Sequence, residues 1–349
     1  MQEIWYIFFA TLPFTVTLMW TVIFLLSYRR SGRARRFLVF FSLVCCMLYF
    51  AHAVHFLWGR PDIGWMDCLY TCCHLSVYPL YYLYIRILTD ASRVRLREYW
   101  VLLPAVFVSL AEAAALLLHR NPSPVLLVSD LVFPVEILLV LFVGYGRLRH
   151  FNRTVENFYS DTEGKTVRPI IVLLIIFAAS SLVSVIFNFI GRDSFLDSPL
   201  LAVPSLLLTV MIFAVFHVGY RQWFNADSLE QDLGEEPEIP EDNAQQEELF
   251  ARIRKEMEEH GLFRRHGLKI SDVCKVLASN RTYVSTCINQ SKGQSFCDFV
   301  NTYRVEYVKR ILESGTDVNI SDLGESAGFS GKSSFFRNFK KSTGMTPSE

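Results

Sequence analysis

Residues 321–341 read SDLGESAGFSGKSSFFRNFKK. This stretch predicts a short helix that begins at Ser321, whose hydroxyl can cap the first turn, and that stops at Gly328. A second helix follows the turn and places Phe335 and Phe339 on its inner face, since residues four apart share one side of a helix. The residues on its outer face are Lys332, Ser333 and Arg337. The stretch therefore predicts two short helices joined by a tight turn.

Residues 271–289 repeat this helix-turn-helix pattern. Ser271 is expected to begin the first helix and Asn280 to cap the second, which turns Val284 and Ile288 toward the core. The inward residues of the first helix are predicted to be Val273, Val276 and Leu277, and the outward residues of the second are Arg281, Thr282, Ser285 and Asn289. Outward hydroxyl, amide and guanidinium groups are suited to contacts with phosphates and base edges.

A long amphipathic helix over residues 295–312, ended by Gly315, connects the two units. Such a connector can hold two recognition helices about one DNA turn apart, roughly 34 Å. Another amphipathic helix is predicted over residues 247–259, ended by Gly261. Two helix-turn-helix units on a rigid spacer therefore predict contacts with successive major grooves of double-stranded DNA.

Residues 262–349 resemble the DNA-binding domain of AraC-type transcription regulators. The motifs that carry the resemblance are Asn280-Arg281-Thr282-Tyr283-Val284-Ser285, Gly293-x-Ser295-Phe296, Asn301-x-x-Arg304 and Gly328-Phe329 with Thr346-Pro347. The resemblance implies two helix-turn-helix units, at about 271–289 and 321–341. Gly324 departs from the pattern, since the family usually has alanine there, and we expect this glycine to cost about 1 kcal/mol of helix stability. Use of the domain for protein interaction alone is the alternative.

The first 220 residues have the hydrophobicity of a membrane protein. Seven apolar stretches of about 20 residues, enough to cross a bilayer, lie at 5–26, 37–58, 66–88, 99–118, 124–145, 169–190 and 199–218. The first stretch has no basic residues before it and no cleavage site after it, so it is predicted to be a retained helix. The fold class is therefore all-α: a seven-transmembrane-helix bundle (1–220) followed by a soluble DNA-binding domain (249–349).

The loops indicate how the bundle is oriented. Thirteen Lys and Arg residues lie after the first, third and fifth stretches, and three lie after the second, fourth and sixth. Because basic loops stay in the cytoplasm, the amino terminus is predicted to lie outside and the carboxyl-terminal domain inside. Residues 221–248 are acidic and contain Pro237 and Pro240, which predicts a solvated linker. We therefore expect a multi-pass protein of the bacterial inner membrane, in contact with membrane lipid.

Ionisable residues within the apolar stretches are candidates for sensing a signal, because charge is costly in hydrocarbon. Glu112 and Glu136 are the acidic candidates. His52 and His55 share one helix face, as do Cys68 and Cys72 on the next helix, and the short loop between the helices should bring the two pairs together. Plain helix packing is the alternative for every one of these residues.

The composition and motifs predict a transcription regulator without catalytic activity and without a cofactor. The sequence shows no phosphate-binding glycine loop, nucleophile elbow or metalloprotease helix. The expected partners are double-stranded DNA, lipid, an unknown signal ligand or membrane protein, and a second copy in a homodimer. The alternatives are a transporter or channel with a regulatory DNA-binding domain, and an enzyme with a membrane metal site at His52, His55 and His74. No bound metal is predicted.

Overall fold

The computed structural model describes residues 2–57, 64–190, 202–233, 246–315 and 318–347. These residues fold predominantly as α-helices and divide into two compact units. The first unit comprises Met1–Arg149 and Val167–Asp227, and the second comprises His150–Thr166 and Ser228–Glu349. The second unit therefore contains a segment from the middle of the chain as well as the carboxyl-terminal part.

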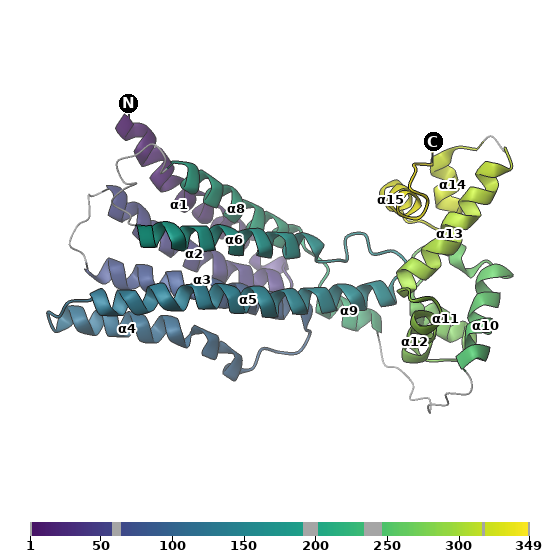
Figure 1. The fold of residues 1–349 in the computed structure, drawn as a ribbon, viewed down its shortest axis with the longest axis horizontal. Helices are drawn as coiled ribbons and strands as arrows, with labels where there is room; N and C mark the ends of the chain where they lie inside the picture. Colours follow the sequence, from purple (N-terminus) through teal and green to yellow (C-terminus); the bar gives the residue numbers. More distant parts are fainter. Residues whose placement is uncertain (1, 58–63, 191–201, 234–245, 316–317, 348–349) are drawn as a thin grey trace. The chain divides into compact units, whose positions relative to one another are not determined.

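The first unit is a bundle of long helices (Figure 1). Its elements are α1 (Gln2–Ser27), η1 (Tyr28–Arg30), α2 (Arg33–Leu57), α3 (Gly64–Thr89), η2 (Leu96–Leu102), α4 (Leu103–Leu117), α5 (Ser123–Phe158, shared with the second unit), α6 (Arg168–Ile190) and α8 (Ala202–Arg221). Each of the seven apolar stretches overlaps one of these long helices. Tyr78, Leu80 and Leu83 of α3 have no exposed surface, which places α3 inside the bundle.

Five helical segments among the described residues are long and apolar enough to cross a membrane. They are Ile7–Arg30, Arg33–Val54, Leu96–Leu117, Ser123–Phe158 and Ser205–Leu233. The described apolar part of α6, Arg168–Val183, is shorter. α3 falls outside this group and carries Asp67 and Arg86, which suits a helix that is surrounded by other helices. Seven crossings therefore stay a prediction.

The second unit consists of short helices around one longer helix. Its elements are the end of α9 (Ala226–Leu233), then α10 (Gln246–Glu258), η5 (Leu262–Arg264), α11 (Ile270–Leu277), α12 (Arg281–Lys292), α13 (Phe296–Glu313), α14 (Ile320–Ser326) and α15 (Lys332–Thr343). α13 runs between the α11–α12 pair and the α14–α15 pair (Figure 1). α9 lies in the stretch that was expected to be a solvated linker.

Two details of the predicted helix pairs are wrong. α14 is capped by Asn319, whose side-chain oxygen accepts a hydrogen bond from the Ser321 backbone N–H at 2.9 Å, so Ser321 lies inside the helix. Val276 is 49% exposed, because Val273 and Leu277 already cover the inner face of the eight-residue α11. Neither error changes which helices form a pair.

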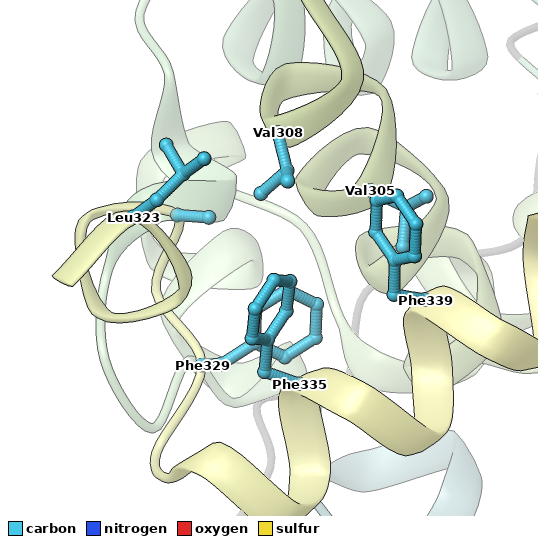
Figure 2. Close-up of a cluster of buried hydrophobic side chains, with 7 residues drawn as sticks. Val305, Val308, Leu323, Phe329, Phe335 and Phe339 are labelled. Carbon is cyan, nitrogen blue, oxygen red and sulfur yellow. The ribbon is translucent and has the colours of Figure 1, made fainter. Parts of the chain in front are cut away.

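An aromatic cluster holds α14 and α15 against α13 (Figure 2). The Phe335 ring lies 5.3 Å from Phe329 and 5.9 Å from Phe339, measured between ring centroids. Phe335 and Phe339 are 1% and 6% exposed, which agrees with their predicted place on the inner face. A Cβ atom on Gly324 would lie 2.6 Å from Cδ1 of Phe335. The close approach of α14 to this ring therefore explains why glycine replaces alanine.

We predict that Gly324→Ala destabilises the second unit, although alanine is the better helix former. The gain of about 1 kcal/mol in helix propensity is opposed by overpacking of a buried ring, which typically costs about 1–3 kcal/mol. Alkylation of the buried thiol of Cys287 in the full chain, followed against urea concentration, measures the loss. Gly331→Ala is the matched control, since a Cβ there meets nothing within 4 Å. A rise in stability for Gly324→Ala would contradict this account.

Candidate nucleic-acid interface

The outward face of α12 begins at a helix terminus that the sequence specifies. The Asn280 side chain accepts a hydrogen bond from the Tyr283 backbone N–H at 2.9 Å, which satisfies one free donor of the first turn. Such a cap contributes about 1 kcal/mol to helix stability. Val284 and Ile288 have no exposed surface and anchor the opposite face. The predicted cap and inner face of α12 are both present.

The four polar residues expected on α12 differ in exposure. Thr282 and Asn289 are exposed, whereas Arg281 and Ser285 are half-buried. Because half-buried side chains pack against neighbouring residues, a substitution of Arg281 or Ser285 would also perturb packing. Of these four, Thr282 and Asn289 are therefore the more accessible to a ligand.

On α15 all three predicted residues are exposed, namely Lys332, Ser333 and Arg337. Lys332 is the first residue of the helix, and its ammonium group lies 5.5 Å from the centroid of the Phe336 ring. The N-terminal backbone N–H groups of a helix and a neighbouring basic side chain together favour an anion such as a phosphate. The start of α15 is thus chemically suited to a nucleic-acid backbone.

Arg304 of α13 holds the two helix pairs from inside. Its guanidinium has no exposed surface and donates through Nε to the Phe263 carbonyl at 2.8 Å and through Nη2 to the Arg265 carbonyl at 3.1 Å. Burial lowers the pKa of Arg304 to about 10, and nearby Asp161 opposes that decrease, so the group remains charged at neutral pH. It lies 5.5 Å from the centroid of the Phe329 ring, just before α15. Arg304 therefore has a structural role.

Sequence reasoning missed the contribution of the segment between α5 and α6. Ser160 is fully buried in the second unit, and its hydroxyl accepts a hydrogen bond from Nη2 of Arg304 at 3.2 Å. Ser334, which follows the exposed Ser333, is also buried and donates to Asp161 at 3.2 Å. Local periodicity carries no information about contacts across more than 100 residues, so no pattern in this one sequence could have found these two.

The acidic sensor candidates lie inside the first unit. Glu112 of α4 is 1% exposed, and one of its carboxylate oxygens, Oε2, has no hydrogen-bond partner among the described residues. Glu136 of α5 is 8% exposed, and neither carboxylate oxygen has a hydrogen-bond partner among the described residues. A buried polar group without a partner costs free energy, which makes Glu136 the less ordinary of the two.

The histidine and cysteine candidates lie where α2 and α3 meet. The His52 ring lies 6.3 Å from the Tyr70 ring, and Tyr70 stacks on His74 at 5.5 Å, both between centroids. Cys68 and Cys72 are half-buried free thiols, and the side chain of His55 lies outside the described residues. Within the part of the chain that the structure describes, no three His, Cys, Asp or Glu side chains are grouped to hold a metal ion.

Comparison with known proteins identifies the class of the carboxyl-terminal domain. Residues 273–349 match the helix-turn-helix domain family, in agreement with the AraC-type resemblance. This part of the chain is therefore an AraC-type helix-turn-helix domain. No solved structure matches the chain.

The similar proteins are named as regulators, and each matches this chain over only 75 to 82 residues. They include the HTH-type transcriptional regulator YtdP of Bacillus subtilis, 31% identical over 80 residues, which are 23% of this chain and 10% of YtdP. The transcriptional regulatory protein YesN of the same organism is 33% identical over 75 residues, or 21% of this chain and 20% of YesN. An HTH-type transcriptional regulator of Staphylococcus aureus (strain COL) is 34% identical over 82 residues, or 24% and 11%. The chain thus spans only about a tenth to a fifth of these relatives.

Proposed function

We propose that this protein is a membrane-bound, sequence-specific DNA-binding transcription regulator. The observation that carries the proposal is the helix-turn-helix family match over residues 273–349, with exposed polar side chains on both second helices. Relatives named as transcriptional regulators share this domain. The proposal assigns DNA binding to the second unit and signal reception to the first.

The two helix pairs act as two helix-turn-helix units, with α12 and α15 as their recognition helices. α13 separates the units and is 18 residues long. At 1.5 Å per residue, such a helix spans about 27 Å, which suits contacts with successive major grooves. The proposed DNA-contacting residues are Arg281, Thr282, Ser285, Asn289, Lys332, Ser333 and Arg337. Binding through two grooves would give a longer, more specific site than one unit could.

Membrane insertion is supported by the surface of α5. Five large apolar side chains, each more than half exposed, follow one face of this helix: Leu127, Leu131, Val135, Leu138 and Phe142. A continuous apolar stripe of this length is unfavourable in water and favourable in lipid. We therefore place the first unit in the inner membrane of a bacterium, with the amino terminus outside and the DNA-binding domain in the cytoplasm.

The signal would be received by buried polar groups of the first unit. Glu136 lies on the same helix as the apolar stripe but is turned away from it, into the bundle. A ligand or partner that supplied a hydrogen bond to this carboxyl group would stabilise one arrangement of the helices. Glu112, His52, His55, Cys68 and Cys72 are the further sensor residues proposed.

For DNA binding, we predict that Lys332→Ala and Arg337→Ala each weaken binding of the full chain in lipid nanodiscs. The loss should be about 1–3 kcal/mol if the side chain contacts a base edge. A phosphate contact would instead weaken all sequences alike and flatten the salt dependence. Fluorescence anisotropy with labelled duplexes measures both quantities. Arg310→Ala, an exposed basic residue of α13, is the control and should bind like the parent. Parent-like binding by both test variants would mean that α15 is not a recognition helix.

For topology, the loop charges predict that a reporter fused after Gly219 lies in the cytoplasm. Green fluorescent protein at this position should fluoresce, whereas alkaline phosphatase should be inactive. A second fusion after Arg120, in a loop with few basic residues, should give the opposite pattern. High phosphatase activity after Gly219 would overturn the proposed orientation.

For sensing, we predict that Glu136→Gln leaves the amount of protein in the membrane unchanged but alters its genomic DNA occupancy. Glutamine keeps the volume and removes the ionisable group, so packing should survive. Occupancy is measured by crosslinking with and without candidate signals. Ser129→Ala, a buried polar residue of the same helix, is the control. Some signals should change the DNA occupancy of the parent. If each of these changes the occupancy of Glu136→Gln equally, Glu136 has only a packing role.

A further inference from the structure

Tyr159, Ser160 and Asp161 follow the end of α5 and are buried in the second unit. They are 2%, 0% and 5% exposed. Three of the helices that they contact, α11, α13 and α15, begin more than 100 positions later in the chain. Surface loops are normally solvated, because a buried loop must find partners for its backbone polar groups. Complete burial of three consecutive loop residues therefore indicates a specific site for them.

The loop contacts the first helix pair immediately before α11. The Ser160 backbone N–H donates to the Leu268 carbonyl at 3.0 Å, and Tyr159 forms an antiparallel bridge with Lys269, which caps α11. The Tyr159 hydroxyl donates to Asp232, and the same carboxylate lies 2.8 Å from Nζ of Lys269. Burial raises the pKa of Tyr159, so its hydroxyl keeps the proton that it donates.

The loop also contacts the connector helix. The Ser160 carbonyl accepts hydrogen bonds from Nδ2 of Asn301 at 3.3 Å and from Sγ of Cys297 at 3.4 Å. The Ser160 hydroxyl accepts from Arg304 at 3.2 Å. Asn301 and Arg304 have exposed fractions of 5% and 0%. They therefore depend on protein partners for their hydrogen bonds.

A third contact reaches the second helix pair. The Ser334 hydroxyl of α15 donates to Oδ1 of Asp161 at 3.2 Å. Ser334 is 1% exposed and directly follows the exposed Ser333 on this helix. Three consecutive loop residues thus contact the start of α11, the middle of the domain at α13, and the recognition helix α15.

We propose that the surface formed by Lys269, Asn301, Arg304 and Ser334 is a docking site for the α5–α6 loop of the same chain, and that the docked loop sets the spacing of the two recognition helices on DNA. This inference rests on the proposed function. The loop is covalently continuous with α5, the helix that carries Glu136. A shift or rotation of α5 therefore changes how residues 159–161 sit against both helix pairs. DNA affinity then depends on the state of the membrane bundle.

Loss of the docked position leaves buried donors without acceptors. Asn301 and Cys297 lose the Ser160 carbonyl, Arg304 loses the Ser160 hydroxyl, and Ser334 loses Asp161. Each unsatisfied buried group favours a rearrangement that lets water in. The second unit can therefore adopt two arrangements. When the loop is docked, the spacing of the two recognition helices is fixed, and when it is undocked, that spacing varies.

Docking is tested first without DNA, on the full chain in nanodiscs, by the alkylation rate of Cys297. Asp161→Ala should raise this rate about tenfold, since a lost hydrogen bond of ordinary strength shifts an opening equilibrium by about that factor. Glu163→Ala removes an exposed carboxylate from the same loop and should leave the rate unchanged. Cys287, buried in α12, reports on global unfolding and should react equally slowly in all variants. Equal Cys297 rates in Asp161→Ala and Glu163→Ala would overturn the docking site.

Ser334→Ala tests the same contact from its other partner. It should raise the Cys297 rate as Asp161→Ala does, and the double variant should show no further increase, because both substitutions remove one hydrogen bond. Additive effects would mean that the two residues act independently and would overturn the contact. Rapid alkylation of Cys287 in Asp161→Ala would mark unfolding, and Ser334→Ala then carries the comparison.

Coupling to DNA is tested with duplexes that the parent chain selects from a randomised pool. One, two or five base pairs are inserted between the two contacted sites. The parent and Glu163→Ala should lose on the order of tenfold or more in affinity for altered spacings, whereas Asp161→Ala should discriminate several-fold less. An unchanged spacing preference in Asp161→Ala, with Cys297 exposed, would overturn the coupling. If the parent binds no duplex, the proposed function fails, while the Cys297 result still decides whether the loop docks.

Discussion

The buried guanidinium of Arg304 is the interaction on which the second unit depends. A buried charge is tolerated only when hydrogen bonds replace its lost water, and here the replacements come from separate parts of the chain. Two carbonyls before α11, the Ser160 hydroxyl, and the Asn301 side chain at 3.4 Å all accept from it. Arg304 can be satisfied only when these segments are assembled, so one side chain links α13 to the segment before α11 and to the α5–α6 loop.

In the first unit, apolar rather than polar side chains cover part of the outer surface. Its apolar side chains are exposed along α5, while three tyrosines of α3 (Tyr78, Tyr81 and Tyr84) and the acids Glu112 and Glu136 lie inside. Arg86 shows how a charge is accommodated at the end of α3: its Nε lies 2.9 Å from Oε2 of Glu98, in the segment before α4. The Arg95 backbone N–H donates to Oε1 of Glu98 at 3.0 Å, so both oxygens of this carboxylate have a partner. Paired charges at helix ends therefore have a structural role. Glu136, which has no partner inside the bundle, has a functional role in our proposal.

The features that sequence predicted are those set by neighbouring residues. The cap at Asn280 and the inner positions of Val284, Phe335 and Phe339 follow from local spacing, and the structure has them. Ser321 failed as a cap because Asn319, two residues earlier, provides an equally good acceptor. Gly324 could be recognised as unusual, but its reason, the Phe335 ring beside it, is a tertiary contact. The DNA-contacting and sensor residues, the domain limits and the number of membrane crossings remain predictions, since they concern partners and surroundings that lie outside the chain.

The burial of the α5–α6 loop in the second unit also determines when that unit can finish folding during synthesis. Residues 150–166 leave the ribosome well before residues 268–334, so the docking surface for the loop does not yet exist when the loop is made. Folding of the second unit must then close a long chain segment, which is slow compared with local helix formation. The same discontinuity bears on proteolysis. A cut between α9 and α10 would free a fragment with both helix pairs but without Ser160 and Asp161, so a released domain would differ in structure from the tethered one.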